Sequence, residues 1–186
     1  MNIQPYSISI PDADLADLRD RLARTRWPDD LVSDWSRGVP VSYARKLVER
    51  WRDFDWRAQE ARLNRYPQVI AEVDGQPIHV VHVTSAAPDA VPLLLCHGYP
   101  TSFVEFTALI DALVEPTEGG PAFHVVIPSI PGLGFSTPLT STGWDIPRIA
   151  GAYDQIMQAL GYERYAVFGG DVGAGILEEL CIEAGE

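Results

Sequence analysis

The stretch YAVFGGDVGAG, Tyr165 to Gly175, decides the fold, because an apolar run ends there among glycines that enclose a single carboxylate, Asp171. The apolar run predicts a buried strand, and the residues after it predict a helix. A sharp turn between the two needs small neighbours, which Gly169, Gly170 and Gly173 provide. The pattern G-x-Nu-x-G is typical of a nucleophile elbow, here with an aspartate as the nucleophile.

Two interpretations of Asp171 are open from these residues alone. An ionised carboxylate at a helix N-terminus is favoured by the helix dipole and the free amides, so Asp171 would be a charged nucleophile that needs no general base. Asp171 could instead only cap the helix that follows, which is a common role of aspartate. A phosphate-binding loop is disfavoured, because no Lys-Ser/Thr pair follows the glycines and the G-x-G-x-x-G spacing is not met.

Upstream of this stretch, two further apolar runs predict buried strands, VPLLLC at 91–96 and FHVVIP at 123–128. A helix with an S-x-x-E capping box, Ser102 to Glu105, is expected after the first strand. A second helix is expected over 145–160, before the next strand. Strands that alternate with helices predict an α/β fold with a parallel, doubly wound sheet.

The part before these strands has a different periodicity. Residues 68–83 alternate on both sides of Asp74 and Gly75, which predicts a hairpin. Residues 1–67 show amphipathic helical patterns, and short helices bury too little surface alone to offset their ordering entropy, so we expect them to pack on the sheet. The predicted domains are a helical segment at 1–67 and a sheet-containing part at 68–186. The helical stripes are Leu15, Leu18 and Leu22; Tyr43, Leu47 and Trp51; and Trp56, Gln59 and Leu63.

The composition excludes several classes of function. A net charge of -12 argues against nucleic acid as a partner, because phosphate binding relies on clustered Lys and Arg. The two cysteines, Cys96 and Cys181, show no spacing typical of a zinc site or a disulfide framework. No apolar run is long enough for a membrane span, and the start has no leader pattern, so we expect a cytoplasmic protein with no membrane contact, cofactor or metal.

The motif HGYP, His97 to Pro100, follows the first parallel strand. The backbone amide of Tyr99 should therefore lie over the same sheet edge as Asp171, and together with the amide of Val172 it would form an oxyanion hole. On its own, HGYP could also be an ordinary turn with a structural histidine.

Other candidate motifs have simpler interpretations. In PGLGFST, Gly132 and Gly134 are expected to be turn glycines rather than ligand contacts. In the hairpin, His79 and His82 are three residues apart and should face opposite sides of the sheet. We therefore predict sheet-surface histidines and not a metal pair.

The motifs HGYP, PSIPGLGFS and GGDVG together resemble the α/β hydrolase core of the microsomal-type epoxide hydrolases. The segments DLRDRLARTRWP and SYARKLVERWRDFDWRAQEARLNRYPQ are similar to the helical N-terminal segment of that family. The resemblance covers nearly all of residues 5–176. It implies that an aspartate attacks an epoxide carbon to form an ester, which a histidine-activated water then hydrolyses to a diol.

Residue by residue, the resemblance implies Asp171 as the nucleophile and the amides of Tyr99 and Val172 as oxyanion donors. It implies that His97, Gly98 and Pro100 shape the loop, and that a small-molecule epoxide is the substrate. Relatives commonly have tryptophan where Val172 stands, and haloalkane dehalogenases use that tryptophan to hold halide, so dehalogenation is the less favoured reaction. Tyr99 also stands where tryptophan is usual, which leaves the backbone donor intact.

In the family, the general-base histidine, its carboxylate partner and the cap tyrosines lie downstream of the elbow, and only 15 residues follow Asp171 here. We therefore expect a chain truncated after the elbow, without the later strands and the cap, and inactive or incomplete alone. Two alternatives are a non-catalytic fragment or interaction module and one half of a split hydrolase. The strand that precedes Asp171 would lie at an open sheet edge, which invites self-association.

Overall fold

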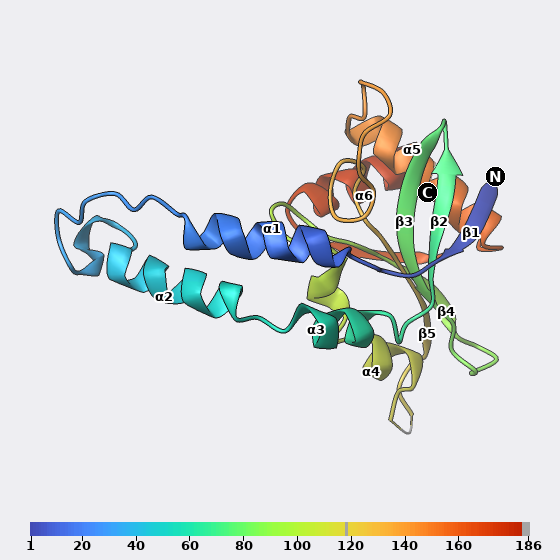
Figure 1. The fold of residues 1–186 in the computed structure, drawn as a ribbon. Coiled ribbons are helices and arrows are strands. Elements are labelled where there is room, and N and C mark those ends of the chain that lie inside the picture. The colour runs from blue at the N-terminus through green and yellow to red at the C-terminus, as the bar shows by residue number, and fades with distance from the viewer. Residues whose placement is uncertain (118, 184–186) are drawn as a thin grey trace. The chain divides into compact units, whose positions relative to one another are not determined.

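The computed structural model describes residues 1–117 and 119–183. Its contacts divide the chain into two compact units, one of Met1–Ser7 with Leu63–Glu186 and one of Ile8–Arg62. The first unit contains the sheet and the second contains helices (Figure 1). The predicted domains, 1–67 and 68–186, place residues 1–7 and 63–67 in the helical segment, whereas the contacts group these residues with the sheet.

The sheet has six strands in the order β1-β2-β3-β5-β4-β6. Strands β4, β5 and β6 are parallel to one another, as the buried apolar runs predict. The pairs β1–β2, β2–β3 and β3–β5 are antiparallel, so the sheet is mixed and only this half of it is parallel. The strands are β1 (Asn2–Tyr6), β2 (Gln68–Val73), β3 (Gln76–Val83), β4 (Val91–Cys96), β5 (Phe123–Pro128) and β6 (Ala166–Gly169).

The predicted hairpin is confirmed, with a two-residue turn between β2 and β3. Asp74 has φ of 51° and Gly75 has φ of 75°, so both central residues are left-handed, as a turn that matches the twist of the strands requires.

Helix α5 (Ile146–Ala159) packs its apolar stripe into the core together with α6 (Val172–Glu183). The side chain of Asp145 accepts a hydrogen bond from the amide of Arg148 and so caps α5. Tyr153 is completely buried at the centre of the stripe. The predicted bounds of this helix agree with the structure.

The helix expected after Ser102 is shorter than predicted and broken. Ser102 accepts a hydrogen bond from the amide of Val104, but it begins only the 3-10 helix η2 (Phe103–Phe106), and α4 (Ile110–Val114) follows separately. The hydroxyl of Thr107 donates to the carbonyl of Val104 at 2.8 Å. A side-chain hydroxyl that donates to a backbone carbonyl competes with the backbone amide that this carbonyl would bond in a continuous helix.

The second unit contains α1 (Asp12–Ala23), η1 (Trp35–Arg37), α2 (Val41–Arg52) and most of α3 (Trp56–Leu63). The three predicted helices are thus present. The apolar stripe of α2 is only about half covered, since Tyr43, Leu47 and Trp51 are 44%, 50% and 56% exposed. Within the described residues, no helix combines the length and the apolar character needed to cross a membrane.

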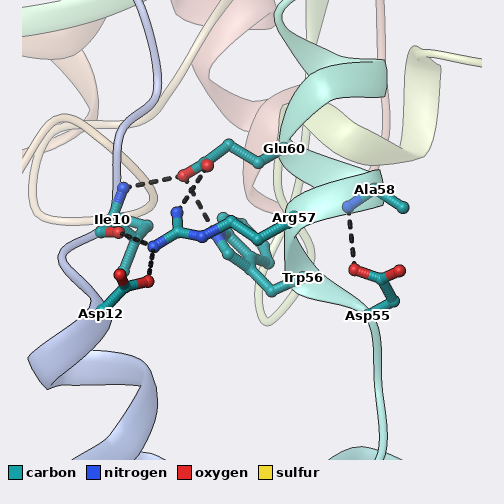
Figure 2. A network of polar contacts seen from close by, with 7 residues as sticks. All are labelled: Ile10, Asp12, Asp55, Trp56, Arg57, Ala58 and Glu60. Atoms are coloured by element: carbon teal, nitrogen blue, oxygen red, sulfur yellow. Dashed lines mark hydrogen bonds and ion pairs between the residues drawn. The ribbon is translucent and has the colours of Figure 1, made fainter.

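A polar network within this unit joins the start of α1 to α3 (Figure 2). Glu60 accepts hydrogen bonds from the amide of Ile10 at 2.8 Å and from the indole of Trp56 at 3.0 Å. The guanidinium of Arg57 bonds Glu60, the carbonyl of Ile10 and the carboxylate of Asp12. The amide of Ile10 is the largest cause of the lowered pKa of Glu60, so the network keeps this carboxylate charged.

The hairpin turn generates a prediction about stability. A Cβ on either Gly75 or Gly170 would meet nothing within 4 Å, but only Gly75 has a positive φ. Gly75→Ala should therefore cost about 1 kcal/mol of unfolding free energy through backbone strain alone. Gly170→Ala is the matched control and should change the free energy far less. Equal losses in urea titrations of the two variants would contradict the backbone explanation.

Candidate active site

Asp171 lies between the end of β6 and the start of α6, in a backbone conformation that L-residues rarely adopt. Its φ is 56°, and Asp74 is the other non-glycine residue with a positive φ in the described part of the chain. Such strain persists only where the surrounding structure enforces it, and it is found often at functional sites. The side chain of Asp171 is exposed rather than packed away.

The carboxylate of Asp171 meets the turn that follows β4. The amide of Tyr99 donates a hydrogen bond to Oδ1 of Asp171 at 3.0 Å. The pKa of Asp171 lies below its ordinary value of 3.8, first because of the Tyr99 amide and then because of the Val172 amide. The structure therefore brings Asp171, Tyr99 and Val172 together, and it keeps the carboxylate charged at neutral pH.

Three glycines permit this close approach. A Cβ on Gly98 would lie 2.6 Å from Cβ of Asp171. On Gly169 and Gly173, a Cβ would lie 2.7 Å and 2.3 Å from the carbonyl oxygen of Cys96. The ends of β4 and β6 and the start of α6 could not meet with larger residues at these positions.

Two other predicted positions have different surroundings. Gly170 faces open space, so the structure gives no steric reason for a glycine there. Pro100 follows Tyr99 through a cis peptide bond.

His97 is buried and ties the HGYP turn to the segment after β5. Its Nε2 accepts a hydrogen bond from the amide of Ile130 at 3.2 Å, so Nδ1 carries the proton and donates to the carbonyl of Gly98 at 2.9 Å. Burial lowers the pKa of His97, which favours the neutral ring. Both ring nitrogens are therefore occupied by the backbone.

The prediction of sheet-surface histidines is wrong for His79, which is completely buried. Its Nε2 bonds Oε1 of Gln68 at 2.8 Å, and its Nδ1 bonds the hydroxyl of Ser129 at 2.9 Å. Burial lowers its pKa to about 4. The rings of Phe103 and Phe135 each lie edge-on to the ring of His79. The polar partners offset the cost of removing the His79 ring from water, because each ring nitrogen keeps a hydrogen bond.

Sequence reasoning missed this network because its members come from separate segments. Ser136 accepts a hydrogen bond from the amide of His79 and donates to the carbonyl of Ser129, which fixes the loop after β5. Gly132 and Gly134, with φ of 86° and 52°, confirm the predicted turn in that loop.

The other two histidines form a separate group. Nε2 of His82 lies 2.9 Å from the hydroxyl of Tyr162, and Nδ1 of His124 accepts from the amide of Ser85 at 3.0 Å. Among the described residues, the His, Cys, Asp and Glu side chains form no cluster of three or more suited to a metal ion.

Comparison with known proteins identifies the family. A family model described as "Epoxide hydrolase N terminus" matches residues 3–106, which is more than half of the chain. The chain belongs to the epoxide hydrolase family. A second model, "alpha/beta hydrolase fold", matches residues 91–184.

Named relatives of this epoxide hydrolase family member agree with the match. A protein of Stigmatella aurantiaca named "Putative epoxide hydrolase" is 47% identical over 96% of this chain and 42% of its own length. Juvenile hormone epoxide hydrolase 2 of Ctenocephalides felis is 34% identical over 96% of this chain and 40% of its own length. The chain therefore spans about 40% of the length of these curated relatives.

Solved epoxide hydrolases share the fold. Juvenile hormone epoxide hydrolase of Bombyx mori matches with a TM-score of 0.89 and 28% identity, over 97% of this chain and 50% of that structure. The Aspergillus niger epoxide hydrolase matches with a TM-score of 0.84 and 34% identity, over 95% of this chain and 48% of that structure.

The buried His79 generates a prediction about acid stability. Its pKa is about 4 in the folded chain against an ordinary 6.5, so it contributes stability that is complete above 6.5 and is lost as the pH falls from there toward 4. Between about pH 7 and pH 5 this group alone should cost about 2 kcal/mol of unfolding free energy. The measurement is urea unfolding at both pH values.

His79→Gln is the control for this prediction, because glutamine does not titrate. The variant should be less stable at neutral pH, yet its unfolding free energy should fall less between the two pH values. An identical pH dependence in both proteins would contradict the assignment to His79.

Proposed function

We propose that this chain carries the ester-forming machinery of an epoxide hydrolase, with Asp171 as the nucleophile. The observation that carries the proposal is the hydrogen bond from the amide of Tyr99 to Oδ1 of Asp171 at 3.0 Å. Because this amide occupies one carboxylate oxygen, the other oxygen, Oδ2, is the one available to attack a substrate. The substrate class is a small-molecule epoxide.

In the attack, a bond forms between Oδ2 and an epoxide carbon while the bond from that carbon to the epoxide oxygen breaks. The electron pair of the broken bond goes to the epoxide oxygen, which then takes up a proton from the surrounding water. Oδ1 becomes the carbonyl oxygen of the ester. It needs no movement, because the Tyr99 amide already holds it.

Hydrolysis of the ester would use the same two amides as an oxyanion hole. Water adds to Cγ of Asp171, and negative charge develops on Oδ1, which accepts from the amide of Tyr99, while the amide of Val172 also bonds this carboxyl group. Collapse of this intermediate breaks the bond between Cγ and Oδ2. Oδ2 leaves as a hydroxyl oxygen of the diol after taking up a proton, and the oxygen of the added water replaces it in the carboxylate. The added water must lose a proton, so a base accelerates this step by about 10² to 10⁴.

The histidines of this chain are poor candidates for that base. The ring nitrogens of His79 and His97 are all engaged inside the core. His82 bonds Tyr162, and His124 bonds the backbone of Ser85. We therefore propose that this chain alone forms the ester faster than it hydrolyses it.

Intact-mass measurement tests the nucleophile. The purified chain is incubated with a reactive epoxide such as styrene oxide near neutral pH, and one covalent adduct should form at Asp171. Asp171→Asn should lose the adduct, because a neutral amide is a poor nucleophile. An adduct of unchanged yield in Asp171→Asn would refute the assignment, and catalytic release of diol would refute the proposal that ester hydrolysis is slow.

Gly98→Ala tests the geometry of the site. The added Cβ would lie 2.6 Å from Cβ of Asp171, so the carboxylate must move away from the Tyr99 amide. Loss of such a donor typically costs about 10²-fold in rate, and we expect adduct formation to slow by at least about tenfold.

Gly151→Ala is the control for this geometric test, because a Cβ there is 3.8 Å from its nearest neighbour, an ordinary contact on α5. Its adduct should form at the rate of the unchanged chain. An unchanged rate in Gly98→Ala would show that the amide contact does not contribute.

A further inference from the structure

The carbonyl oxygen of Gly98 accepts two side-chain hydrogen bonds. Nδ1 of His97 donates to it at 2.9 Å, and the hydroxyl of Thr101 donates to it at 3.0 Å. A carbonyl oxygen has two lone pairs, and the two donors occupy both of them. The direction of this carbonyl is therefore fixed by side chains from two sides.

This carbonyl belongs to the same peptide unit as the amide of Tyr99. The unit is planar and trans, so its C=O and N–H point in opposite directions. The N–H donates to Oδ1 of Asp171 at 3.0 Å. Whatever holds the carbonyl of Gly98 thus also sets the direction of the Tyr99 amide.

Glycine at position 98 makes such a restraint important. A Cβ there would lie 2.6 Å from Cβ of Asp171, so a larger residue does not fit without a shift. Glycine also has more backbone conformations open to it than other residues have, so the peptide that follows it rotates more easily. Hydrogen bonds to the carbonyl oppose this rotation.

We propose that Thr101 is a positioning residue of the candidate active site, which acts with His97 to aim the amide of Tyr99 at Asp171 through the shared peptide. The geometric part of this inference stands on the three hydrogen bonds, and its consequence for the reaction rests on the proposed function. Thr101 itself contacts no reacting atom. Its hydroxyl acts by direction and also by polarisation, since a donor at the carbonyl strengthens the N–H of the same peptide as a donor.

The two donors differ in how they are held. The ring of His97 is buried, and the amide of Ile130 donates to its Nε2, so removal of the ring would also leave that amide without its partner. The bond from Thr101 is local, because it spans three residues and closes a turn. Removal of this hydroxyl should loosen the peptide without disturbing the core, which makes Thr101 the residue to test.

A hydroxyl that only closes a turn is the alternative interpretation, and the chain offers a matched case. The hydroxyl of Thr107 donates to the carbonyl of Val104 at 2.8 Å, also three residues back. The amide in the same peptide as that carbonyl, the amide of Glu105, donates to the carbonyl of Ser102. Thr107→Val therefore removes the same kind of hydrogen bond at a peptide that does not face Asp171.

Amide hydrogen exchange and a carboxylate titration, both followed by nuclear magnetic resonance on the full chain without epoxide, test the geometry. In Thr101→Val, exchange at the Tyr99 amide should be about two- to tenfold faster, the factor expected for loss of one hydrogen bond. The pKa of Asp171 should rise, because the Tyr99 amide is the largest cause of its lowering. An unchanged exchange rate or an unchanged Asp171 titration in Thr101→Val would overturn the proposal.

Two further variants separate positioning from turn closure. Thr107→Val should change neither the Tyr99 exchange rate nor the Asp171 titration. Thr101→Ser keeps a hydroxyl and should return both quantities nearly to those of the unchanged chain. Equal effects of Thr101→Val and Thr107→Val, or no rescue by Thr101→Ser, would give Thr101 a structural role alone and overturn the proposal.

Nitrogen chemical shifts of the His97 ring test the second donor without any substitution. The proposal requires a proton on Nδ1 and none on Nε2 at neutral pH, because Nε2 accepts from the amide of Ile130. A proton on Nε2 alone would overturn the proposed pair of donors.

The rate of adduct formation connects the geometry to the reaction. With styrene oxide, Thr101→Val should form the Asp171 adduct about two- to tenfold more slowly than the unchanged chain, measured by intact mass. If the unchanged chain forms no adduct while exchange and titration behave as expected, the proposed function fails and the positioning by Thr101 stands. If the unchanged chain forms the adduct and Thr101→Val matches its rate, the positioning role is overturned and Asp171 remains the nucleophile.

Discussion

The hydrogen bond from the amide of Tyr99 to the carboxylate of Asp171 is the interaction on which the candidate site depends. The two residues are 72 positions apart, so only the fold brings them together. Strands β4 and β6 are parallel neighbours with Cys96 beside Gly169, and they therefore end at the same level of the sheet. Gly98 and Gly173 then allow the two turns to approach closely enough for an amide to reach a carboxylate.

Peptide dipoles rather than cations keep Asp171 charged. Residues 67–186 contain only two basic residues, Arg148 and Arg164, against 15 acidic ones. The guanidinium of Arg148 lies over Trp144 and near Asp74. For the proposed nucleophile, the amide of Tyr99 is better suited than an ion pair, because it is directional and holds Oδ1 without covering Oδ2. A lowered pKa is thus compatible with an oxygen that stays free to react.

The sequence was sufficient for the parts of the fold that follow from local pattern. Apolar runs predicted β4, β5 and β6, and Asp74-Gly75 predicted the hairpin turn. The sequence was not sufficient where contacts between distant segments decide whether a residue is buried or which strands pair. His79 alternates with its neighbours as a half-exposed residue would, and its burial depends on Ser129, 50 positions away. The antiparallel joining of β3 to β5 likewise has no local signal.

Strand β6 leads directly into the candidate site, because Asp171 lies between its end and the start of α6. Strand β6 has only four residues. In the described chain it has one neighbouring strand, β4. The position of Asp171 must then be fixed by packing at the turn, where Gly169 and Gly173 contact the carbonyl of Cys96. Glycine, which elsewhere adds flexibility, here allows the backbone contacts that hold the strained residue in place.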